Sequence, residues 1–353
     1  MSPRASRKNS SPAKKITLAD VAKQSAVSLT TVSLVLRNKP GVGIPVETRR
    51  RVMDTARDLG YRVKAPLKPR QGLTTIGVIL KARADDLPLA NPFYSHVYAG
   101  IEAGCRLNRL NLLNASLLVD ENNIPIELPR MLEAEHIEGL LLVGTFVDTT
   151  LDHVLGEKSI PVVLVDAYSE SNAYDAVVSE NFQGAYRAVS YLIENGHRHI
   201  GLVGTFCQAY PSILERRRGY LEALHDHDIA ETYFADCILH PDDARLAAKQ
   251  LLAKNPQITA LFGANDRVTI AAMLAASELG KHVPDDLSLV GFDDIDLAHL
   301  VKPALTTMQV DKISLGRLAV QTLLNRVQMP TVPPTVTALR TRLIERQSVK
   351  DIR

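Results

Sequence analysis

The chain of 353 residues contains no tryptophan and only three cysteines, Cys105, Cys207 and Cys237. The cysteines lie far apart and form no CxxC pair, which excludes a disulfide framework, so we expect free thiols in a reducing compartment. No apolar run approaches the ~18–20 residues that a membrane helix needs. The amino-terminal stretch is basic but lacks the apolar segment of a secretory signal. The sequence therefore predicts a cytoplasmic protein.

Motifs of catalysis and cofactor binding are missing as well. The glycine-containing strand ends carry neither GxGxxG nor GKS/T, and no GxSxG nucleophile elbow is present. The acidic and histidine groups at 225–228 and 293–299 lack a third ligand at zinc spacing. We therefore expect no cofactor, no metal and no enzymatic activity. Residues 331–353 show no leucine heptads, which argues against a tetramer.

Positive charge is concentrated at the amino end. Residues 1–72 contain 16 Lys and Arg against 4 Asp and Glu, a net charge of +12. The whole chain has 41 against 39, so the remainder has 25 against 35, a net charge of −10. A basic head attracts phosphate, whereas an acidic body is repelled by DNA. A merely solvated basic tail explains residues 1–15 but not the basic residues further on.

Residues 16–36, ITLADVAKQSAVSLTTVSLVL, predict two short helices joined by a tight turn. In the first helix, Leu18, Val21 and Ala22 recur at the spacing of one buried stripe. Ser28 suits the N-cap of the second helix. The outward-facing residues of that second helix are Leu29, Thr30, Ser33, Leu34 and Arg37. This layout is typical of a helix-turn-helix, whose second helix enters the DNA major groove; an ordinary helical hairpin is the alternative.

The rest of the chain divides into three parts. A third helix is predicted at about 45–59, with Gly60 at its carboxyl end. It completes a DNA-binding head at 16–62, and the basic residues 1–15 before the head are expected to be a disordered tail. Residues 63–74 are rich in proline and basic residues and read as a linker. From residue 75 to 353, short β-rich apolar runs alternate with amphipathic helical patterns. This alternation predicts an α/β core of doubly wound parallel sheets, in two lobes because it is too long for one.

Ordered strings along the chain resemble the LacI/GalR (lactose-repressor) family of bacterial transcription regulators. Beside the helix-turn-helix string they are ETRRRVMDTARDLGYR, TIGVIL, NPFYSHVYAGIEAGC, EGLLLVG, NGHRHIGLVG, ERRRGYLEAL, GANDRVTIAAM, VPDDLSLVGFDDI and LTTMQVDKISLGRLAV. The resemblance implies a core like that of periplasmic binding proteins, in which the chain crosses between the two lobes three times. One lobe would hold about 75–168 and 307–327, and the other about 170–305 with the carboxyl-terminal tail. It also implies a homodimer on an inverted-repeat operator.

The resemblance assigns DNA contacts within the head. The family reads bases through the first, second and sixth positions of the recognition helix, here Leu29, Thr30 and Leu34. The sixth position is often Arg, which forks onto guanine. We expect Leu34 to face a thymine methyl group instead, with packing on the linker or a partner as the alternative. Phosphate contacts, which position without reading sequence, are expected from Thr17, Ser28, Thr31 and Ser33.

The linker departs from the family pattern. The family has a short hinge helix that wedges a leucine into the minor groove, which bends DNA. Leu67 would be that wedge here, but Pro66 and Pro69 flank it, and proline inside a helix costs ~3 kcal/mol. An extended linker is therefore the alternative to a hinge helix.

The resemblance also places a small-molecule effector between the lobes. The matching residues are Asn91, Phe93, Arg216, Asn265, Asp266 and Asp293. Amide, carboxylate and guanidinium groups suit the hydroxyl groups of a sugar, and Phe93 would stack on its ring. The alternatives are that Asp266 caps the helix starting near Val268 and that Asp293 forms an Asx turn.

These observations predict an allosteric, nucleoid-associated DNA-binding repressor that a small molecule, a carbohydrate or its derivative, controls. A solute-binding protein or an α/β enzyme carrying a DNA anchor is the second hypothesis. The missing export signal argues against the former and the missing catalytic motifs against the latter.

Overall fold

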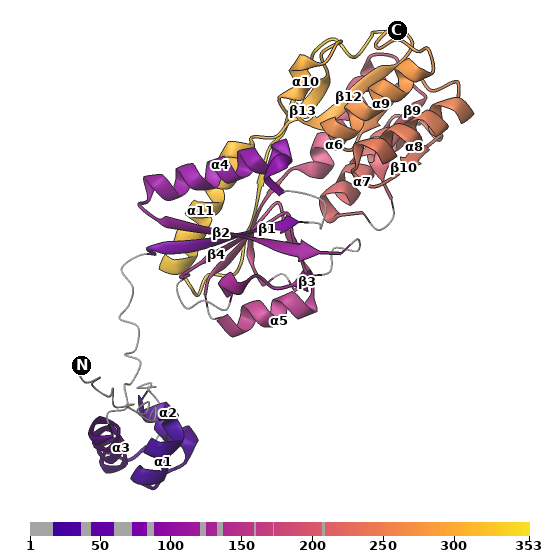
Figure 1. Cartoon of the computed structure of the whole chain (residues 1–353). Helices are drawn as coiled ribbons and strands as arrows, with labels where there is room; N and C mark the ends of the chain where they lie inside the picture. Colours follow the sequence, from indigo (N-terminus) through magenta and orange to yellow (C-terminus); the bar gives the residue numbers. More distant parts are fainter. Residues whose placement is uncertain are drawn as a thin grey trace, which may run out of the picture. The chain divides into compact units, whose positions relative to one another are not determined.

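The computed structural model describes residues 17–36, 44–59, 73–82, 88–120, 125–132, 137–158, 160–171, 173–206 and 209–353, without the side chains of 18, 33, 36, 150, 157 and 158. The chain divides into two units, Met1–Gln71 and Gly72–Arg353 (Figure 1). Within the described residues, none of the helices has the length and apolar character to cross a bilayer.

The first unit contains the three predicted helices, α1 (Leu18–Ser25), α2 (Leu29–Leu36) and α3 (Val46–Asp58). Thr17 and Asp20 cap α1 reciprocally, and α1 ends at Ala26, whose φ of 51° is left-handed. The small core is built from Val21, Ala22, Val32, Val35, Val52 and Ala56, all buried. The helical periodicity in the sequence thus predicted the core of the head. Gly60 and the linker up to residue 72, including Leu67, lie outside the described residues.

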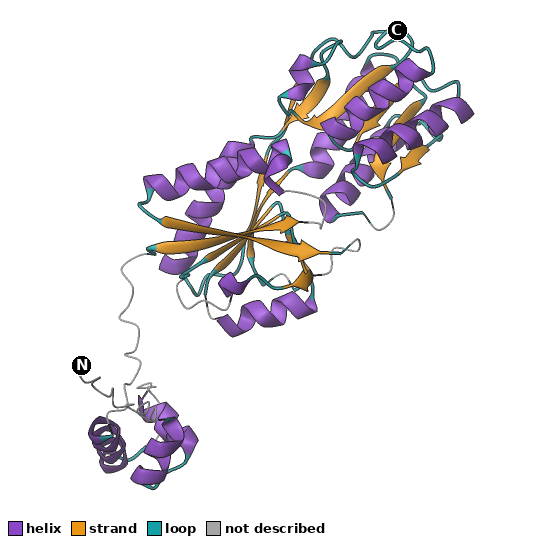
Figure 2. Cartoon of the chain, viewed as in Figure 1, coloured by secondary structure: helices purple, strands orange, loops and turns teal. Residues whose placement is uncertain are grey.

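The second unit contains two sheets with helices on both faces (Figure 2), which confirms the predicted α/β class. The first sheet runs in the order β14 (Val336–Leu339), β8 (Asp175–Ser179), β6 (Val162–Val165), β4 (Leu140–Val143), β1 (Thr75–Ala82), β2 (Asn111–Val119) and β3 (Pro125–Glu127). It is parallel except for β3. Helices α4 (Pro92–Leu107) and α11 (Lys312–Gln328) cover one face and α5 (Thr149–Lys158) the other. Because both faces are covered, every residue of β4 and β6 is buried and apolar.

Short elements at the rim of the first lobe are the 3₁₀ turns η1 (Pro88–Ala90) and η2 (Arg130–Leu132), and the strand pair β5 (Phe146–Val147) and β7 (Tyr168–Ser169).

The second sheet runs in the order β10 (Tyr233–Asp236), β9 (Ile200–Thr205), β11 (Ala260–Gly263), β12 (Ser288–Asp293), β13 (Thr306–Gln309) and β15 (Arg342–Ile344). Only β15 is antiparallel to its neighbour in this sheet of the described chain. Helices α6 (Asn181–Glu194) and α7 (Pro211–Asp226) cover one face, and α8 (Pro241–Lys254) and α9 (Asp266–Glu278) the other, with α10 (Leu297–Leu300) beside α9. Side chains of β9 alternate between the two faces of the sheet, since Leu202 packs on the side of α6 and α7 whereas Val203 packs on the side of α8 and α9.

The chain passes between the two sheets three times, but not where the resemblance placed the crossings. β8 belongs to the first sheet, so the first crossing lies between Ser179 and Asn181, and not near 168–170. β13 belongs to the second sheet, so the second crossing falls between Gln309 and Lys312. The tail is shared, because β14 pairs with β8 before β15 joins the second sheet. Long-range strand pairing decides these boundaries, and no local pattern reports it.

Candidate functional site

The recognition helix α2 presents its first residues outward. Leu29 is 52 % exposed, Thr30 is exposed, and Leu34 is half-buried. Val32 and Val35 on the opposite side are buried in the core of the head. The helix therefore offers the side chains that the sequence assigned to bases, and base contact by each of them stays a prediction. The side chain of Ser33 lies outside the described part of the chain.

The hydroxyl groups predicted to contact phosphate also cap helices. Thr17 Oγ1 donates to Asp20 Oδ2 at 2.7 Å. Ser28 Oγ accepts from the Thr31 backbone N–H at 3.1 Å and lies 2.8 Å from Thr31 Oγ1. These residues thus mark the amino ends of α1 and α2, where the helix dipole and free N–H groups favour phosphate. Their phosphate contacts remain predictions.

In the second unit, two buried aspartates stand at strand ends in opposite lobes. Asp166 directly follows β6 and is 5 % exposed, and Asp293 ends β12 and is 6 % exposed. Both have left-handed φ angles, 46° and 106°, which non-glycine residues rarely adopt. Lys312, the first residue of α11, donates its ammonium to the carbonyl oxygens of Asp293 at 2.5 Å and Asp294 at 3.0 Å. This bridge from α11 stabilises the unusual turn that carries Asp293.

Arg216 of α7 is buried between several partners. Its Nε donates to Asn181 Oδ1 at 2.9 Å, and Nη1 donates to the Ala264 carbonyl oxygen at 2.5 Å. The guanidinium lies over the Phe292 ring, 3.8 Å from the centroid. Nη2 forms an ion pair with Asp293 Oδ1 at 3.2 Å. Arg216 is therefore held in place by the protein and lends positive potential to the carboxylates.

Several buried oxygen atoms at this place have no hydrogen-bond partner. Five buried side-chain polar atoms of the described residues lack one, and four lie at the carboxyl ends of β6, β8, β9 and β12. They are Asp166 Oδ1, Ser179 Oγ, Thr205 Oγ1 and Asp293 Oδ1. Buried polar atoms in native proteins are almost always paired. Ligands of open α/β sheets bind outside the carboxyl ends of the strands. Asp166, Thr205, Asp293 and the neighbouring Arg216, called the cleft cluster below, therefore have the location and the acceptors of a binding site. Ser179 lines a separate pocket that is described below.

Burial shapes the protonation of the carboxyl groups. It raises the pKa of Asp166 to about 7; the positive charge of Arg216 opposes the rise, while Asp293 adds to it. Burial also raises the pKa of Asp293, against the opposing charges of Arg216 and Lys312. The two carboxyl groups are therefore held in a weakly solvated pair that a donor-rich ligand would stabilise.

The other predicted effector residues have structural partners. Asn91 caps α4 by accepting from the Phe93 N–H at 3.1 Å, and Phe93 is buried edge-on against Tyr94. Asn265, and not Asp266, is the N-cap of α9, since its Oδ1 accepts from the Val268 N–H at 2.9 Å.

Asp266 is fully buried within the second lobe. Its Oδ2 accepts from the Ile295 N–H at 2.8 Å, and its Oδ1 accepts from the Thr307 hydroxyl at 2.5 Å. Burial and the charge of Asp293 raise its pKa to about 8. Among the six predicted residues, Arg216 and Asp293 thus lie in the cleft cluster, and ligand contact by the other four stays a prediction.

Sequence reasoning missed Asp166, Ser179 and Tyr210. Asp166 follows the apolar run at 161–165, just as Asp293 ends the one at 287–292, so strand-end position was an available signal. Tyr210, at the N-cap of α7 in the second lobe, donates its hydroxyl to the carbonyl oxygens of Thr145 at 2.7 Å and Asp166 at 3.2 Å in the first lobe. Tyr210 therefore bridges the lobes beside the cleft cluster.

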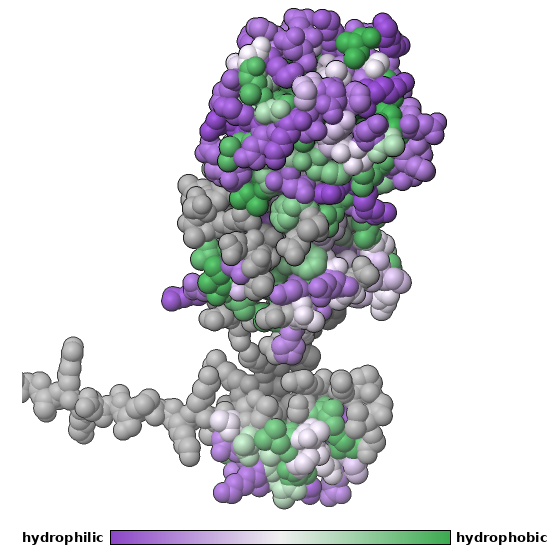
Figure 3. All heavy atoms as spheres, turned by 90° about the vertical axis from the view of Figure 1, so that its right-hand side faces the viewer, coloured by the Kyte–Doolittle hydropathy of each residue, from purple (hydrophilic) through white to green (hydrophobic). Residues whose placement is uncertain are grey.

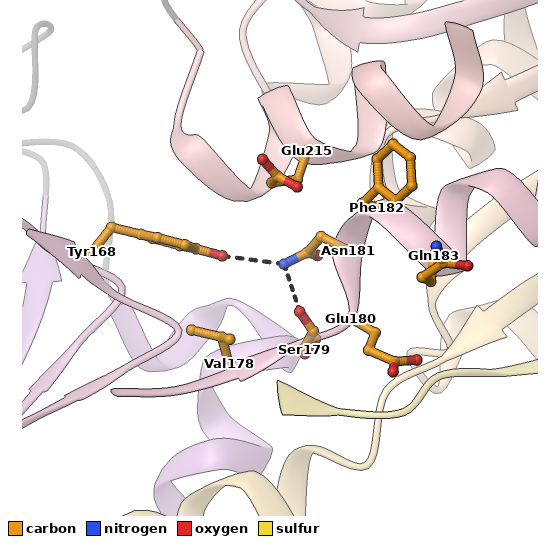
Figure 4. A pocket seen from close by; sticks show the side chains of 8 residues that line it. All are labelled: Tyr168, Val178, Ser179, Glu180, Asn181, Phe182, Gln183 and Glu215. Atoms are coloured by element: carbon orange, nitrogen blue, oxygen red, sulfur yellow. Dashed lines mark hydrogen bonds between the residues drawn. The ribbon is translucent and has the colours of Figure 1, made fainter. Parts of the chain in front are cut away.

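A pocket of about 250 Å³ adjoins the cleft cluster at the first crossing (Figure 4). It is lined by Tyr168, Val178, Ser179, Glu180, Asn181, Phe182, Gln183 and Glu215 and is called the hinge pocket below. Asn181 Nδ2 donates to the Tyr168 hydroxyl at 3.2 Å, drawn in Figure 4, while its Oδ1 holds Arg216. Within the described ranges, no three His, Cys, Asp or Glu side chains gather as metal ligands.

Comparison with known proteins agrees with this arrangement. The family of bacterial regulatory proteins of the lacI type matches residues 17–63, and a periplasmic binding protein-like domain matches residues 189–349. The HTH-type transcriptional repressor PurR of Photobacterium profundum is 31 % identical over 95 % of this chain and 99 % of its own. The ribose operon repressor of Haemophilus influenzae is 31 % identical over 96 % and 99 %. The solved lac repressor dimer, bound to operator and the anti-inducer ONPF, is 25 % identical over 96 % and 100 %, with a TM-score of 0.68.

Proposed function

Because this chain belongs to the lacI family of bacterial regulatory proteins, and is thus a DNA-binding transcriptional regulator with an effector-binding core, we propose that it is a homodimeric repressor whose effector is a carbohydrate. Two heads would read the half-sites of an inverted repeat, as two-fold symmetry requires. It acts where its operator is, on cytoplasmic DNA, and binds its small molecule without transforming it.

The cleft cluster carries the choice of ligand. Its buried atoms without a hydrogen-bond partner are Asp166 Oδ1, Asp293 Oδ1, which is ion-paired with Arg216, and the Thr205 hydroxyl, so it has more acceptors than donors. Vicinal sugar hydroxyls donate to carboxylates in charge-assisted hydrogen bonds, whereas an anion would meet two aspartates. Relatives with the same architecture support this choice, since a ribose operon repressor and a CelR–cellobiose complex are among them.

Ligand and DNA binding would be coupled by lobe closure. Asp166 and Asp293 belong to different lobes, so a ligand that bonds both is held more tightly in the closed state than in the open one. That difference in affinity is what shifts the equilibrium and alters the spacing of the heads.

An apolar surface on the second lobe supports the dimer. Leu274 of α9 and Leu297 and Leu300 of α10 are 56 %, 48 % and 61 % exposed on neighbouring helices. Figure 3 shows one face of the molecule, on which apolar side chains form groups among hydrophilic ones. Exposed leucines grouped in this way are typical of a subunit interface. Leu300→Lys should give monomers by sedimentation and weaken operator binding, whereas Leu246→Lys on α8, also exposed, serves as control.

The deciding experiment joins operator and ligand. Operator fragments selected from a random duplex pool are titrated with the full chain while pentoses, hexoses and disaccharides are added. We expect one of these sugars to change operator affinity, and Asp166→Asn with Asp293→Asn to abolish the response but not operator binding itself. A response that survives both substitutions would contradict the assignment of the site, and absence of sequence preference would contradict the function.

A further inference from the structure

We propose that the hinge pocket is a second small-molecule site, distinct from the cleft cluster, for a compact neutral molecule rich in hydroxyl groups. The pocket takes Tyr168 and Val178 from the first lobe, the crossing at 179–180, and Asn181 and Glu215 from the second lobe. A molecule bound there touches both lobes and the segment about which they turn.

Unpaired donors lie on the wall of this pocket. Helix α6 starts at Asn181 without a side-chain cap, and among the described residues the backbone N–H groups of Asn181, Phe182 and Gln183 have no acceptor. The N-cap residue Glu180 turns its carboxylate to Arg187 instead, at 3.0 Å. A helix end in a pocket normally finds partners for such groups in side chains, water or a ligand.

A buried hydroxyl group gives a second, independent sign. Ser179 lines the same pocket, is 4 % exposed, and its Oγ has no hydrogen-bond partner among the described residues. Buried hydroxyls without a partner are rare in native proteins. The pocket thus combines three free donors from the backbone with a hydroxyl that both donates and accepts.

The charges of the wall select the ligand class. No lysine or arginine is among the lining residues, whereas Glu215 contributes a carboxylate, one oxygen of which accepts from Arg218 at 2.7 Å, and Glu180 is paired with Arg187. A phosphate or carboxylate ligand would therefore meet charge of its own sign. A hydroxyl group accepts from the α6 N–H groups and donates to a carboxylate, so a polyol satisfies both. Tyr168 and Phe182 provide aromatic walls, and about 250 Å³ lies at the small end of ligand sites.

Occupancy of this pocket would act on the cleft cluster. Asn181 contributes to both, because its amide nitrogen donates to Tyr168 and its amide oxygen accepts from Arg216 Nε. A ligand that fixes Tyr168 and Asn181 fixes the orientation of Arg216. The hinge pocket is therefore placed to tune the affinity of the cleft cluster for its own ligand.

The lack of tryptophan permits a direct test. Phe182→Trp gives the full chain a single tryptophan in the pocket wall, which can be excited at wavelengths that the tyrosines do not absorb, and Phe234→Trp on β10 is the matched control. Each phenylalanine has an α7 guanidinium over its ring, 5.7 Å away for Phe182 and 3.9 Å away for Phe234. The probes are glycerol, ribitol and D-ribose, with inorganic phosphate as the anion. We expect a saturable change for a polyol in Phe182→Trp and none in Phe234→Trp or with phosphate.

Two further variants separate this site from the cleft cluster. Adding Asp166→Asn and Asp293→Asn should leave the signal of Phe182→Trp intact, while adding Glu215→Lys should weaken polyol binding by at least about tenfold, as loss of a charge-assisted hydrogen bond implies. A signal that disappears with the cleft substitutions reports the cleft cluster and overturns the proposal. So does the absence of a saturable change with all three polyols. Neither result bears on operator binding, which tests the proposed function.

Discussion

Removing the Tyr210 hydroxyl tests whether the lobes are held together by the contact beside the cleft cluster. Tyr210→Phe deletes one oxygen and keeps the ring, which lies edge-on to Tyr168 at 5.6 Å and 4.5 Å from the Lys81 ammonium. The hydrogen bonds to the carbonyl oxygens of Thr145 and Asp166 are lost. Burial and neighbouring negative charge raise the Tyr210 pKa well above its usual value, so the hydroxyl remains a donor throughout the physiological range.

The size of the effect follows from one lost donor. A neutral hydrogen bond contributes about 1 kcal/mol net. The two carbonyl oxygens can bond water instead only when the lobes are open, so loss of the hydroxyl destabilises the closed state. One kcal/mol corresponds to about a fivefold shift of the closed-to-open ratio, from RT of ~0.6 kcal/mol. Backbone amides that are protected from solvent only while the lobes are closed should then exchange their hydrogen with solvent about fivefold faster.

Hydrogen exchange followed by mass spectrometry measures this shift on the full chain. Peptides covering β4–β5 and β6–β7, which face Tyr210, should exchange faster in Tyr210→Phe than in the unmodified protein. Tyr191→Phe is the matched control, because its hydroxyl donates to Glu345 at 3.1 Å within the second lobe. Unchanged exchange in these peptides, or an equal rise in the control, would refute the assignment of Tyr210 as a bridge between lobes.

Three further predictions concern the head, the buried carboxyl and the cleft. Leu34→Arg should shift operator selection toward guanine at one position of each half-site, because Arg forks onto guanine; an unchanged preference would show that Leu34 does not face the bases. Asp266 has a folded pKa of about 8 against 3.8 unfolded, so the folded state keeps a proton that the unfolded chain releases. The contribution of Asp266 to the free energy of unfolding is therefore largest below about pH 4. It falls by ~1.4 kcal/mol per pH unit between about pH 4 and pH 8, and it levels off above about pH 8. Urea unfolding at pH 5, 6 and 7 should show a fall of this sign, to which Asp166, with a pKa raised to about 7, also contributes. Asp266→Asn should make the slope shallower, and an equal slope in the variant would contradict the raised pKa of Asp266. Lys312→Met should weaken the effector response because it frees the turn that carries Asp293, whereas Lys312→Arg should retain part of the response. If both variants respond as strongly as the unmodified protein, Lys312 does not support the site.

Local patterns accounted for much of the fold. The three helices of the head and the strands at 76–80, 140–143 and 260–263 follow from apolar spacing within a few residues, and the structure confirms them. Arg216 and Asp293 were assigned through the family resemblance, and the structure brings them to 3.2 Å of each other. Neighbouring Asn265 and Asp266 were assigned in the same way, but one is a cap and the other a buried acceptor. A sequence motif predicts where a turn lies, but it does not predict the direction in which each side chain points.

Short-range features can be read from the residues alone: which segments are helix or strand, where positive charge is concentrated, and which family strings occur in which order. The tertiary structure alone decided the lobe to which β8 and β14 belong, since they are paired across about 160 residues of chain. It alone placed Asp166 near Arg216 and Tyr210 on the first lobe. Periodicity indicates only which side of its own helix or strand a residue buries, whereas a binding site is formed by elements that meet only when separate sheets pack.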